Sequence, residues 1–267
     1  MHRPYDITFS ADRRQFLAAG LGWLWPFRRR EARLEGARFR VVRRGRGGRR
    51  YLHIHGNEST AREALLAHVA RHSGVAHLIV GNQRNVPVGG GQIDPNRMFS
   101  REGAGRNLRR LNPAWSEAEL ARALDALDRG RERLLAALLP REGGLLVAVH
   151  NNSEGYSVRD ETASSDRVSI PDPDHPHEFF LCTQAPDFER LAESKYNVVL
   201  QNTAAAEDDG SLSRLAARRG VRYVNLECGL GKAREQAEML EYATFALPER
   251  RPTDRARPAS GPASGSR

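Results

Sequence analysis

The amino-acid sequence predicts an α/β domain with a mostly parallel central sheet and helices on both faces. Short apolar runs at 76–81 (AHLIVG) and 144–150 (GLLVAVH) are typical of strands that are buried on both sides. Amphipathic segments at 59–71 and 116–139 have the longer period of helices. Strand-like and helix-like segments alternate along the chain, which favours a mostly parallel sheet with helices on both faces.

The individual elements follow from periodicity and from start and stop signals. Strands are expected at 37–42, 51–55, 76–81, 144–150, 178–183, 197–201 and 221–227. Helices are expected at 59–71, 116–139, 188–194, 211–219 and 232–245. Ser116 and Glu119 have the spacing of a capping box at the start of the longest helix. Residues 82–112 and 151–178 lack a clear period and are expected to be long loops, which are often functional.

Composition divides the chain into three parts. Residues 1–35 form a basic segment that resembles an export signal, and residues 36–247 form the expected folded domain. Residues 248–267 are rich in Pro, Ser, Gly and Arg and are expected to be disordered. The two cysteines, Cys182 and Cys228, permit one disulfide at most and lack the CxxC spacing of a metal site.

The N-terminal segment suggests a destination for the protein. Residues 12–17 (DRRQFL) resemble a twin-arginine signal, and an apolar run at 17–27 follows that is too short to span a bilayer in the ordinary way. A working signal would make the protein periplasmic or secreted. If the segment is only a basic tail with a hydrophobic stretch, the protein is cytoplasmic.

The net charge of +9 comes from one short region. Eleven arginines and two glutamates lie between residues 28 and 50, and this excess equals the net charge of the whole chain. Such a segment could contact nucleic acid or an anionic membrane surface, which is one alternative function. Because the rest of the chain is neutral, no nucleic-acid partner is expected as the main one.

Candidate metal ligands follow the predicted strands. His55 and Glu58 lie on the turn between the strand that ends near 54 and the helix that begins at 59. His150 ends the strand at 144–149, and Glu227 ends the strand at 221–226. Ligands bind at the carboxyl ends of the strands in open α/β sheets, so these side chains are candidates for one site. Two histidines and one glutamate make an open zinc site.

Four segments, in this order, resemble the zinc carboxypeptidase superfamily, particularly its succinylglutamate desuccinylase/aspartoacylase branch. They are 55–58 (HGNE), 94–99 (DPNRMF), 147–150 (VAVH) and 225–227 (NLE). They match a His-x-x-Glu turn, an Asp-x-Asn-Arg-x-Phe segment, a lone His after a hydrophobic strand and a Glu that ends a late strand. The similarity covers roughly residues 37–245 and implies the carboxypeptidase-like fold.

The resemblance implies a zinc hydrolase with one Zn²⁺. His55, Glu58 and His150 would hold the ion and leave a fourth position for water, whose pKa the metal lowers. Glu227 would be the general base that takes the proton from water and delivers it to the leaving nitrogen. The reaction would be hydrolysis of an amide bond beside a carboxylate-bearing group.

The resemblance also implies substrate-binding residues. Arg97 would grip a substrate carboxylate through its planar guanidinium, with Asn96 as a neutral helper. The family places a second arginine, which stabilises the oxyanion, just before its Asn-Arg pair, but this chain has Gln92 and glycines there. Arg84 is the nearest upstream candidate. The family's active-site tyrosine has no obvious match.

Several alternatives stay open at this point. The substrate could be a peptide with a free C-terminus, as for a carboxypeptidase, or an N-acyl amino acid, as for a deacylase. The chain could also be a non-catalytic relative that binds zinc and a peptide or amino acid without hydrolysing it, since two of the family's catalytic residues lack a clear match.

Overall fold

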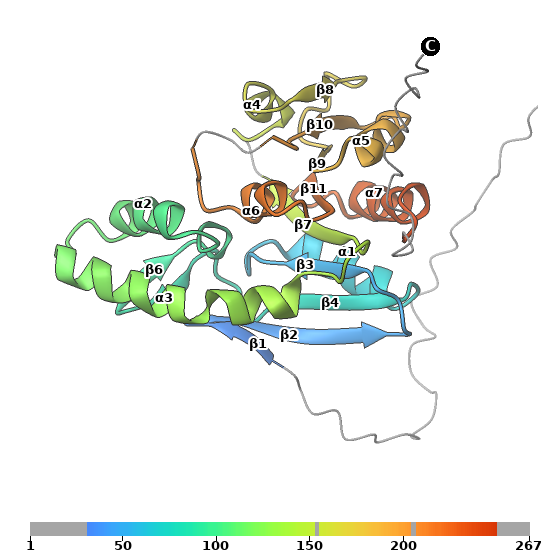
Figure 1. Cartoon of the computed structure of the whole chain (residues 1–267). Coiled ribbons are helices and arrows are strands. Elements are labelled where there is room, and N and C mark those ends of the chain that lie inside the picture. Colours follow the sequence, from blue (N-terminus) through green and yellow to red (C-terminus); the bar gives the residue numbers. More distant parts are fainter. Residues whose placement is uncertain (1–30, 153–154, 204–206, 250–267) are drawn as a thin grey trace, which may run out of the picture.

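A nine-stranded mixed sheet forms the centre of the described chain (Figure 1). The computed structural model describes residues 31–152, 155–203 and 207–249. The strand order is β1 (Glu31–Leu34), β2 (Ala37–Arg44), β4 (Gly74–Ile79), β3 (Arg50–His53), β7 (Leu146–Asn152), β11 (Tyr223–Gly229), β9 (Phe179–Cys182), β10 (Asn197–Leu200) and β8 (Arg167–Ser169). A separate hairpin contains β5 (Val86–Val88) and β6 (Gly91–Ile93).

The middle of the sheet is parallel, as the sequence predicts. Strands β4, β3, β7 and β11 pair in parallel in that order, and β9 and β10 form a further parallel pair. Antiparallel pairing is found where β1, β2 and β8 complete the edges and where β9 joins β11. The parallel middle strands are buried on both faces, which explains why they read as continuous apolar runs in the sequence.

Helices cover both faces of the sheet. They are α1 (Ser59–Val69), α2 (Arg101–Leu111), α3 (Glu117–Leu138), α4 (Val158–Thr162), α5 (Ala185–Ala192), α6 (Leu212–Arg218) and α7 (Ala233–Ala246). Figure 1 shows α2 and α6 on one side of the strands and α5 and α7 on the other. Alternate strand residues face opposite cores: Leu52 and Ala148 join the core under α2, α3 and α6, whereas Tyr51 and Val149 join the core under α1, α5 and α7.

The start of the longest helix confirms the predicted capping box. The Ser116 hydroxyl accepts from the Glu119 backbone N–H, and the Glu119 carboxylate accepts from the Ser116 backbone N–H. This reciprocal pair satisfies two donors that the first turn of a helix would otherwise leave without partners.

The two predicted long loops contain regular structure, so those two expectations are wrong. Residues 82–112 hold the hairpin β5–β6, a short 3₁₀ helix η1 (Pro95–Arg97) and α2. Residues 151–178 hold α4 and β8. Helix α2 escapes notice because two glycines and several arginines dilute its apolar face. Gly103 is needed there, since a Cβ atom would lie 2.1 Å from the Gly210 backbone nitrogen.

The basic segment is partly built into the sheet. Strand β1 pairs with β2, so the folded domain includes residues 31–35, ahead of the boundary expected at 36. Arg38 and Arg40 alternate outward on β2, whereas Arg49 is buried and donates to the Leu247 carbonyl at 2.6 Å. The predicted export signal, and nearly all of the tail expected at 248–267, lie outside the described residues. Within the described ranges, no helix has the length and apolar character needed to cross a bilayer.

Candidate metal centre and active-site pocket

Strand register brings the candidate residues to one edge of the sheet. His53 pairs with Val149, so the turn after β3 lies beside the carboxyl end of β7. In the neighbouring pair of strands, β7 and β11, His150 lies directly opposite Glu227. The turn itself requires Gly56, because a Cβ atom there would lie 2.6 Å from the Gln83 carbonyl oxygen. Residues up to 172 positions apart, His55 and Glu227, therefore lie near the carboxyl ends of three neighbouring parallel strands.

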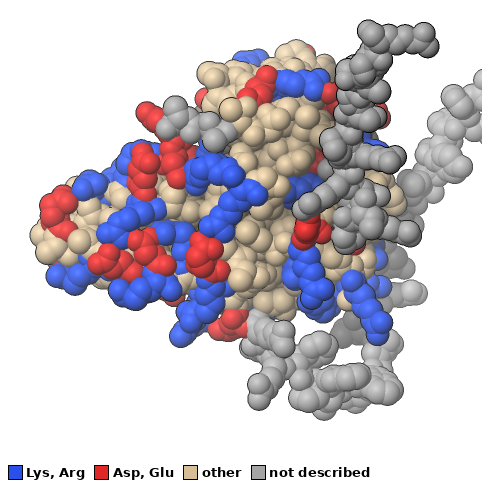
Figure 2. All heavy atoms as spheres, viewed as in Figure 1, with Lys and Arg blue, Asp and Glu red and all other residues tan. Residues whose placement is uncertain are grey.

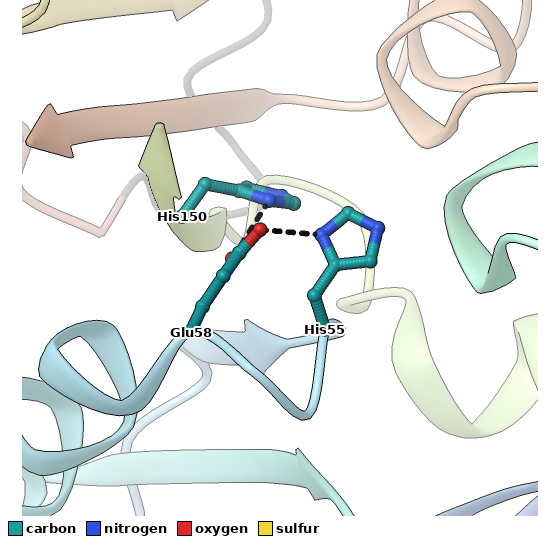
Figure 3. A group of neighbouring side chains, drawn as sticks. All are labelled: His55, Glu58 and His150. Carbon is teal, nitrogen blue, oxygen red and sulfur yellow. Dashed lines mark hydrogen bonds and ion pairs between the residues drawn. The ribbon is translucent and has the colours of Figure 1, made fainter. Parts of the chain in front are cut away.

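The predicted ligands His55, Glu58 and His150 converge on one point (Figure 3). His55 Nδ1 lies 2.8 Å from Glu58 Oε1, and His150 Nδ1 lies 3.3 Å from Glu58 Oε2. One potential ligand atom from each residue lies within 4.8 Å of the others, and all three side chains are buried. The two imidazoles and the carboxylate thus face one another.

A fourth buried residue, Asp94, fixes the orientation of His55. Its Oδ1 lies 2.8 Å from His55 Nε2, which leaves His55 Nδ1 facing Glu58 and His150. Burial disfavours the charged ring of His55, but hydrogen bonds to Asp94 and Glu58 outweigh it and raise its pKa to about 9. Burial opposes ionisation of Asp94 as well, yet the hydrogen bond to His55 holds the pKa of that carboxyl below its usual value.

This donor set fits a divalent transition metal. Two imidazole nitrogens and one carboxylate are the ligands of open zinc sites in hydrolases. A carboxylate that accepts the second ring N–H of a ligating histidine is the usual support for such a site, and Asp94 occupies that position on His55. We therefore treat the cluster as a candidate metal centre, with zinc favoured by the ligand types.

Glu227 is a buried carboxylate next to this cluster. Its Oε1 accepts a hydrogen bond from Asn225 Nδ2 at 3.0 Å. Burial raises the pKa of Glu227, and the nearby negative charge of Glu58 raises it further. A carboxyl group with a raised pKa holds a proton more strongly than one in water, as general acid–base chemistry requires.

A cavity of about 560 Å³ opens over these residues. All seven residues singled out from the sequence line it: His55, Glu58, Arg84, Asn96, Arg97, His150 and Glu227. Other lining residues include Glu161 on α4 and Arg214 on α6, together with Tyr156, which precedes α4, and Gln201, which follows β10. The sheet edge and the loops beyond it thus form one polar pocket around the candidate metal centre.

The three predicted substrate-binding residues have different surroundings. Arg84 is half exposed and spans two carboxylates, with Nη1 3.2 Å from Glu58 Oε1 and Nη2 3.3 Å from Asp94 Oδ2. Arg97 lies 3.8 Å from the exposed carboxylate of Asp209. Asn96 uses its side-chain oxygen to accept from the Leu212 backbone N–H at the start of α6. Arg97 also donates through Nη1 to the Asn96 carbonyl at 2.9 Å, so its guanidinium is held from one nitrogen.

The sequence-based interpretation assigned no role to Arg214 or Tyr156, which both line the cavity. Arg214 lines the cavity, and its Nη1 atom is buried with no hydrogen-bond partner. Tyr156 donates its hydroxyl to Glu161 at 2.7 Å, and burial together with the charge of Glu227 raises the pKa of that phenol. No motif marks Arg214, because α6 approaches the site only in the folded chain. Tyr156 lies in a segment that was expected to be a loop.

Several solved structures are similar to this chain. A succinylglutamate desuccinylase/aspartoacylase from Rhodobacter sphaeroides is 15% identical, with 79% of this chain and 59% of that chain covered and a TM-score of 0.39. The ectoine utilization protein EutE (DoeB) from Ruegeria pomeroyi is 16% identical, with 79% and 60% covered and a TM-score of 0.39. A candidate metallopeptidase from Shewanella amazonensis SB2B is 14% identical, with 82% and 84% covered and a TM-score of 0.39.

These similar structures include the branch that the sequence motifs resemble. This chain spans about three fifths of the length of the first two. No protein-family model matches the sequence, and no curated protein matches it significantly. At such low identity the likeness concerns the fold alone. The described residues form a mixed α/β fold with a buried His/Glu/His cluster and an adjacent buried carboxylate.

Proposed function

We propose that this protein is a zinc-dependent hydrolase that cleaves an amide bond beside a carboxylate-bearing group. The observation that carries the proposal is the meeting of His55, Glu58 and His150 beside the buried Glu227 in one polar cavity. A metal-binding cluster alone would suit a structural role. The nearby carboxylate with a raised pKa is the addition that hydrolysis needs.

The proposed metal would be held by His55 Nδ1, the Glu58 carboxylate and His150 Nδ1. Bound there, it would supply Lewis acidity toward the scissile carbonyl and lower the pKa of water. Asp94 keeps the His55 ring in the orientation that faces the other two ligands. Arg84 donates to Glu58 Oε1, the oxygen that also contacts His55, and to Asp94 Oδ2, and so restrains both carboxylates.

Glu227 is the proposed general base and acid. Its carboxylate would accept a proton from the attacking water and then deliver that proton to the departing amide nitrogen, which leaves as an amine. Asn225 holds the carboxylate through the 3.0 Å hydrogen bond. His150, its neighbour in the register of β7 and β11, keeps Glu227 close to the ligand cluster.

The proposed substrate carries a free carboxylate, because two arginines that line the cavity have guanidinium N–H groups that the described protein residues leave available. Among the described residues, the Arg97 side chain donates one hydrogen bond, from Nη1 to the Asn96 carbonyl at 2.9 Å, and lies 3.8 Å from the exposed carboxylate of Asp209. Arg214 has a buried Nη1 atom without a hydrogen bond. A planar guanidinium binds a carboxylate through two parallel hydrogen bonds. A peptide C-terminus and an N-acyl amino acid both present this group, so both belong in the test panel.

The decisive experiment compares wild-type protein with the Glu227→Gln variant. Both are stripped of metal, reloaded with one equivalent of zinc, and assayed on panels of N-acyl amino acids and short peptides. We expect the variant to retain zinc and to lose roughly 10²–10⁴-fold in kcat, the usual contribution of general acid–base catalysis. Equal hydrolysis by the two proteins would refute the assigned role of Glu227.

Glu63→Gln provides the matched control for this experiment. Glu63 is exposed on α1, so the same chemical change occurs outside the cavity, and activity should stay at the wild-type level. If wild-type protein binds zinc and binds panel members but hydrolyses none of them, the protein is a binding protein that uses the same pocket.

A nucleic-acid or membrane role for the Arg-rich segment has less support in the described residues. Figure 2 shows basic and acidic side chains interspersed over the lobe that contains α2 and α3. Arg101 pairs with Asp125 and Asp128 there, and Arg109 pairs with Glu117. Such pairing lowers the net field that would attract a polyanion. DNA binding that is sensitive to salt and is lost on deletion of residues 28–50 would revive this alternative.

A further inference from the structure

A second cluster of potential metal ligands lies at the far end of α1. His68 is in the last turn of α1, His72 follows the helix, and Glu241 lies on α7, which packs along α1. One possible ligand atom from each of the three residues lies within 4.8 Å of the others. This cluster is separate from the cavity around His55, whose lining includes none of these residues.

The two histidines have the spacing and the arrangement of paired ligands. They are four residues apart, and their rings stack with centroids 4.3 Å apart. His68 Nδ1 lies 3.4 Å from Glu241 Oε1, and His72 Nε2 lies 2.8 Å from Glu241 Oε2. In a tetrahedral zinc site, with bonds of about 2.0–2.1 Å, neighbouring ligand atoms are roughly 3.3 Å apart. Movements of an ångström or so would therefore convert this cluster into a coordination shell.

The surroundings of His68 provide an independent sign of a ligand site. Its side chain is 1% exposed, and Nδ1 has no hydrogen-bond partner although it points toward Glu241. The opposite nitrogen, Nε2, lies 3.2 Å from the Tyr51 hydroxyl and 3.0 Å from Thr244 Oγ1. With Nε2–H donating to one of these oxygens, Nδ1 has a free lone pair. This is how ligating histidines are usually oriented.

Solvent can reach the other side of the cluster. The side chains of His72 and Glu241 are 24% and 27% exposed, so water could complete the coordination of an ion. Arg71 contacts Glu241 Oε1 at 2.8 Å, but its side chain is 59% exposed and can move aside. Imidazole nitrogens with one carboxylate suit zinc and its borderline neighbours better than Mg²⁺ or Ca²⁺, which prefer oxygen ligands.

We propose that His68, His72 and Glu241 form a second site for a zinc-class divalent metal, which fastens the end of α1 to α7. The site is independent of the proposed hydrolysis. It has no buried carboxylate base among its contacts in the described chain, so its role is stabilising. Glu58, at the other end of α1, belongs to the candidate active site, and a fixed α1 would help to hold that residue in place.

The test is metal stoichiometry of the untagged full-length chain. Protein freed of metal is titrated with zinc against a chromogenic chelator, and we expect two equivalents to bind to wild type. His72→Ala and Glu241→Gln should each bind one equivalent, with the other weakened by at least about 100-fold, since loss of a ligand exceeds the 10–100-fold effect of losing a ligand's support. His175→Ala, at an exposed histidine elsewhere, should bind two.

The His55→Ala variant separates this proposal from the proposed function. If both are right, His55→Ala binds one equivalent, and the His55→Ala/His72→Ala double variant binds none. If wild type binds one equivalent and His72→Ala still binds it with equal affinity, the second site is refuted and the first survives. If wild type binds one equivalent that His72→Ala loses and His55→Ala keeps, the first site is refuted instead.

Cobalt and thermal unfolding provide readouts that do not depend on the chelator. Co²⁺ bound to His55→Ala protein should show visible absorption bands that disappear in the double variant. Zinc at 100 times its dissociation constant for the second site should raise the Tm of His55→Ala by roughly 5–10 °C, because a ligand that binds only the folded state stabilises it. An unchanged Tm together with no cobalt bands would overturn the proposal.

Discussion

The two histidine–glutamate clusters have the same kinds of ligands but very different neighbours. His55, Glu58 and His150 lie at the carboxyl ends of parallel strands, beside Asp94 and Glu227 and under a cavity of about 560 Å³. His68, His72 and Glu241 lie between two helices, beside hydroxyl groups and an exposed arginine. Three candidate ligands are sufficient for the metal binding that we propose at each cluster, whereas the proposed hydrolysis also needs a cavity and a base.

Helix α1 connects the two clusters. Glu58 precedes its first residue, and His68 lies in its last turn. The packing of α1 against the sheet and against α7 therefore positions a ligand at each end. If a substitution in one cluster changes the metal affinity of the other, the two sites are coupled through this helix.

The strongest test of the different roles proposed for the two clusters is to replace one histidine in each. We expect His55→Ala to abolish hydrolysis by the zinc-loaded protein, because the proposed active site loses a ligand that two carboxylates support. His72→Ala should keep the wild-type kcat at 25 °C. Activity is measured on the best substrate of the panel. Loss of activity in both variants, with both folded by circular dichroism, would contradict the division of roles.

Replacing the arginines of the cavity should distinguish residues that bind the substrate from residues that carry out hydrolysis. We expect Arg97→Ala to lower kcat/KM by about 10–100-fold, since a hydrogen bond to a charged group contributes roughly 1.5–3 kcal/mol. Arg214→Ala should have an effect of the same kind if its unpaired nitrogen binds substrate. Arg38→Ala, at an exposed position on β2, is the control. If both cavity variants match this control, the carboxylate anchor lies elsewhere.

Replacing the residue that orients His55 should weaken only one site. Asp94→Asn keeps the size of the side chain but removes its charge, and we expect zinc affinity at the first site to fall about 10–100-fold. The second site should be unaffected, because Asp94 contacts none of its residues. Competition titration with a chelator measures both affinities in one experiment. An equal change at the two sites would mean that Asp94 acts through the fold as a whole.

The buried His77 belongs to neither cluster, and its titration gives a reference for how acid destabilises the fold. It is 3% exposed on β4, and burial, together with the charges of Arg50 and Arg43, lowers its pKa to about 4. Between the unfolded value of 6.5 and about 4, the unfolded chain binds the proton more readily than the folded one. Its contribution to stability is therefore full above pH 6.5 and is lost as the pH falls toward 4.

The expected size of this loss follows from the shift. Between pH 7 and pH 5, titration of His77 should reduce the free energy of unfolding by about 2 kcal/mol. We expect His77→Leu to remove that part of the pH dependence, as measured by urea unfolding of the metal-free protein at both pH values. An unchanged pH dependence would show that other buried groups dominate.

The sequence was most informative where chemistry and local structure coincide. The turn with His55 and Glu58, the strand that carries His150 and the capping box at Ser116 were all predicted, because each depends on residues that are neighbours in the chain, although that strand continues to Asn152 rather than ending at His150. Helix α2 was missed, since its apolar face is diluted and its close packing through Gly103 depends on Gly210, 107 positions away. Strand β1 was missed as well, because its charged outward residues hid the alternation.

By itself, the sequence determined the α/β alternation, the parallel strands at the centre and the residue types of the candidate active site. Those features depend on periodicity and on motifs, which short stretches of chain already contain. Only the tertiary structure decided that Asp94 supports His55, that Arg214 enters the cavity, and that His68 and His72 meet Glu241. Such contacts join residues that are 39 or more positions apart, and their distances are set by the packing of helices and strands rather than by local propensity.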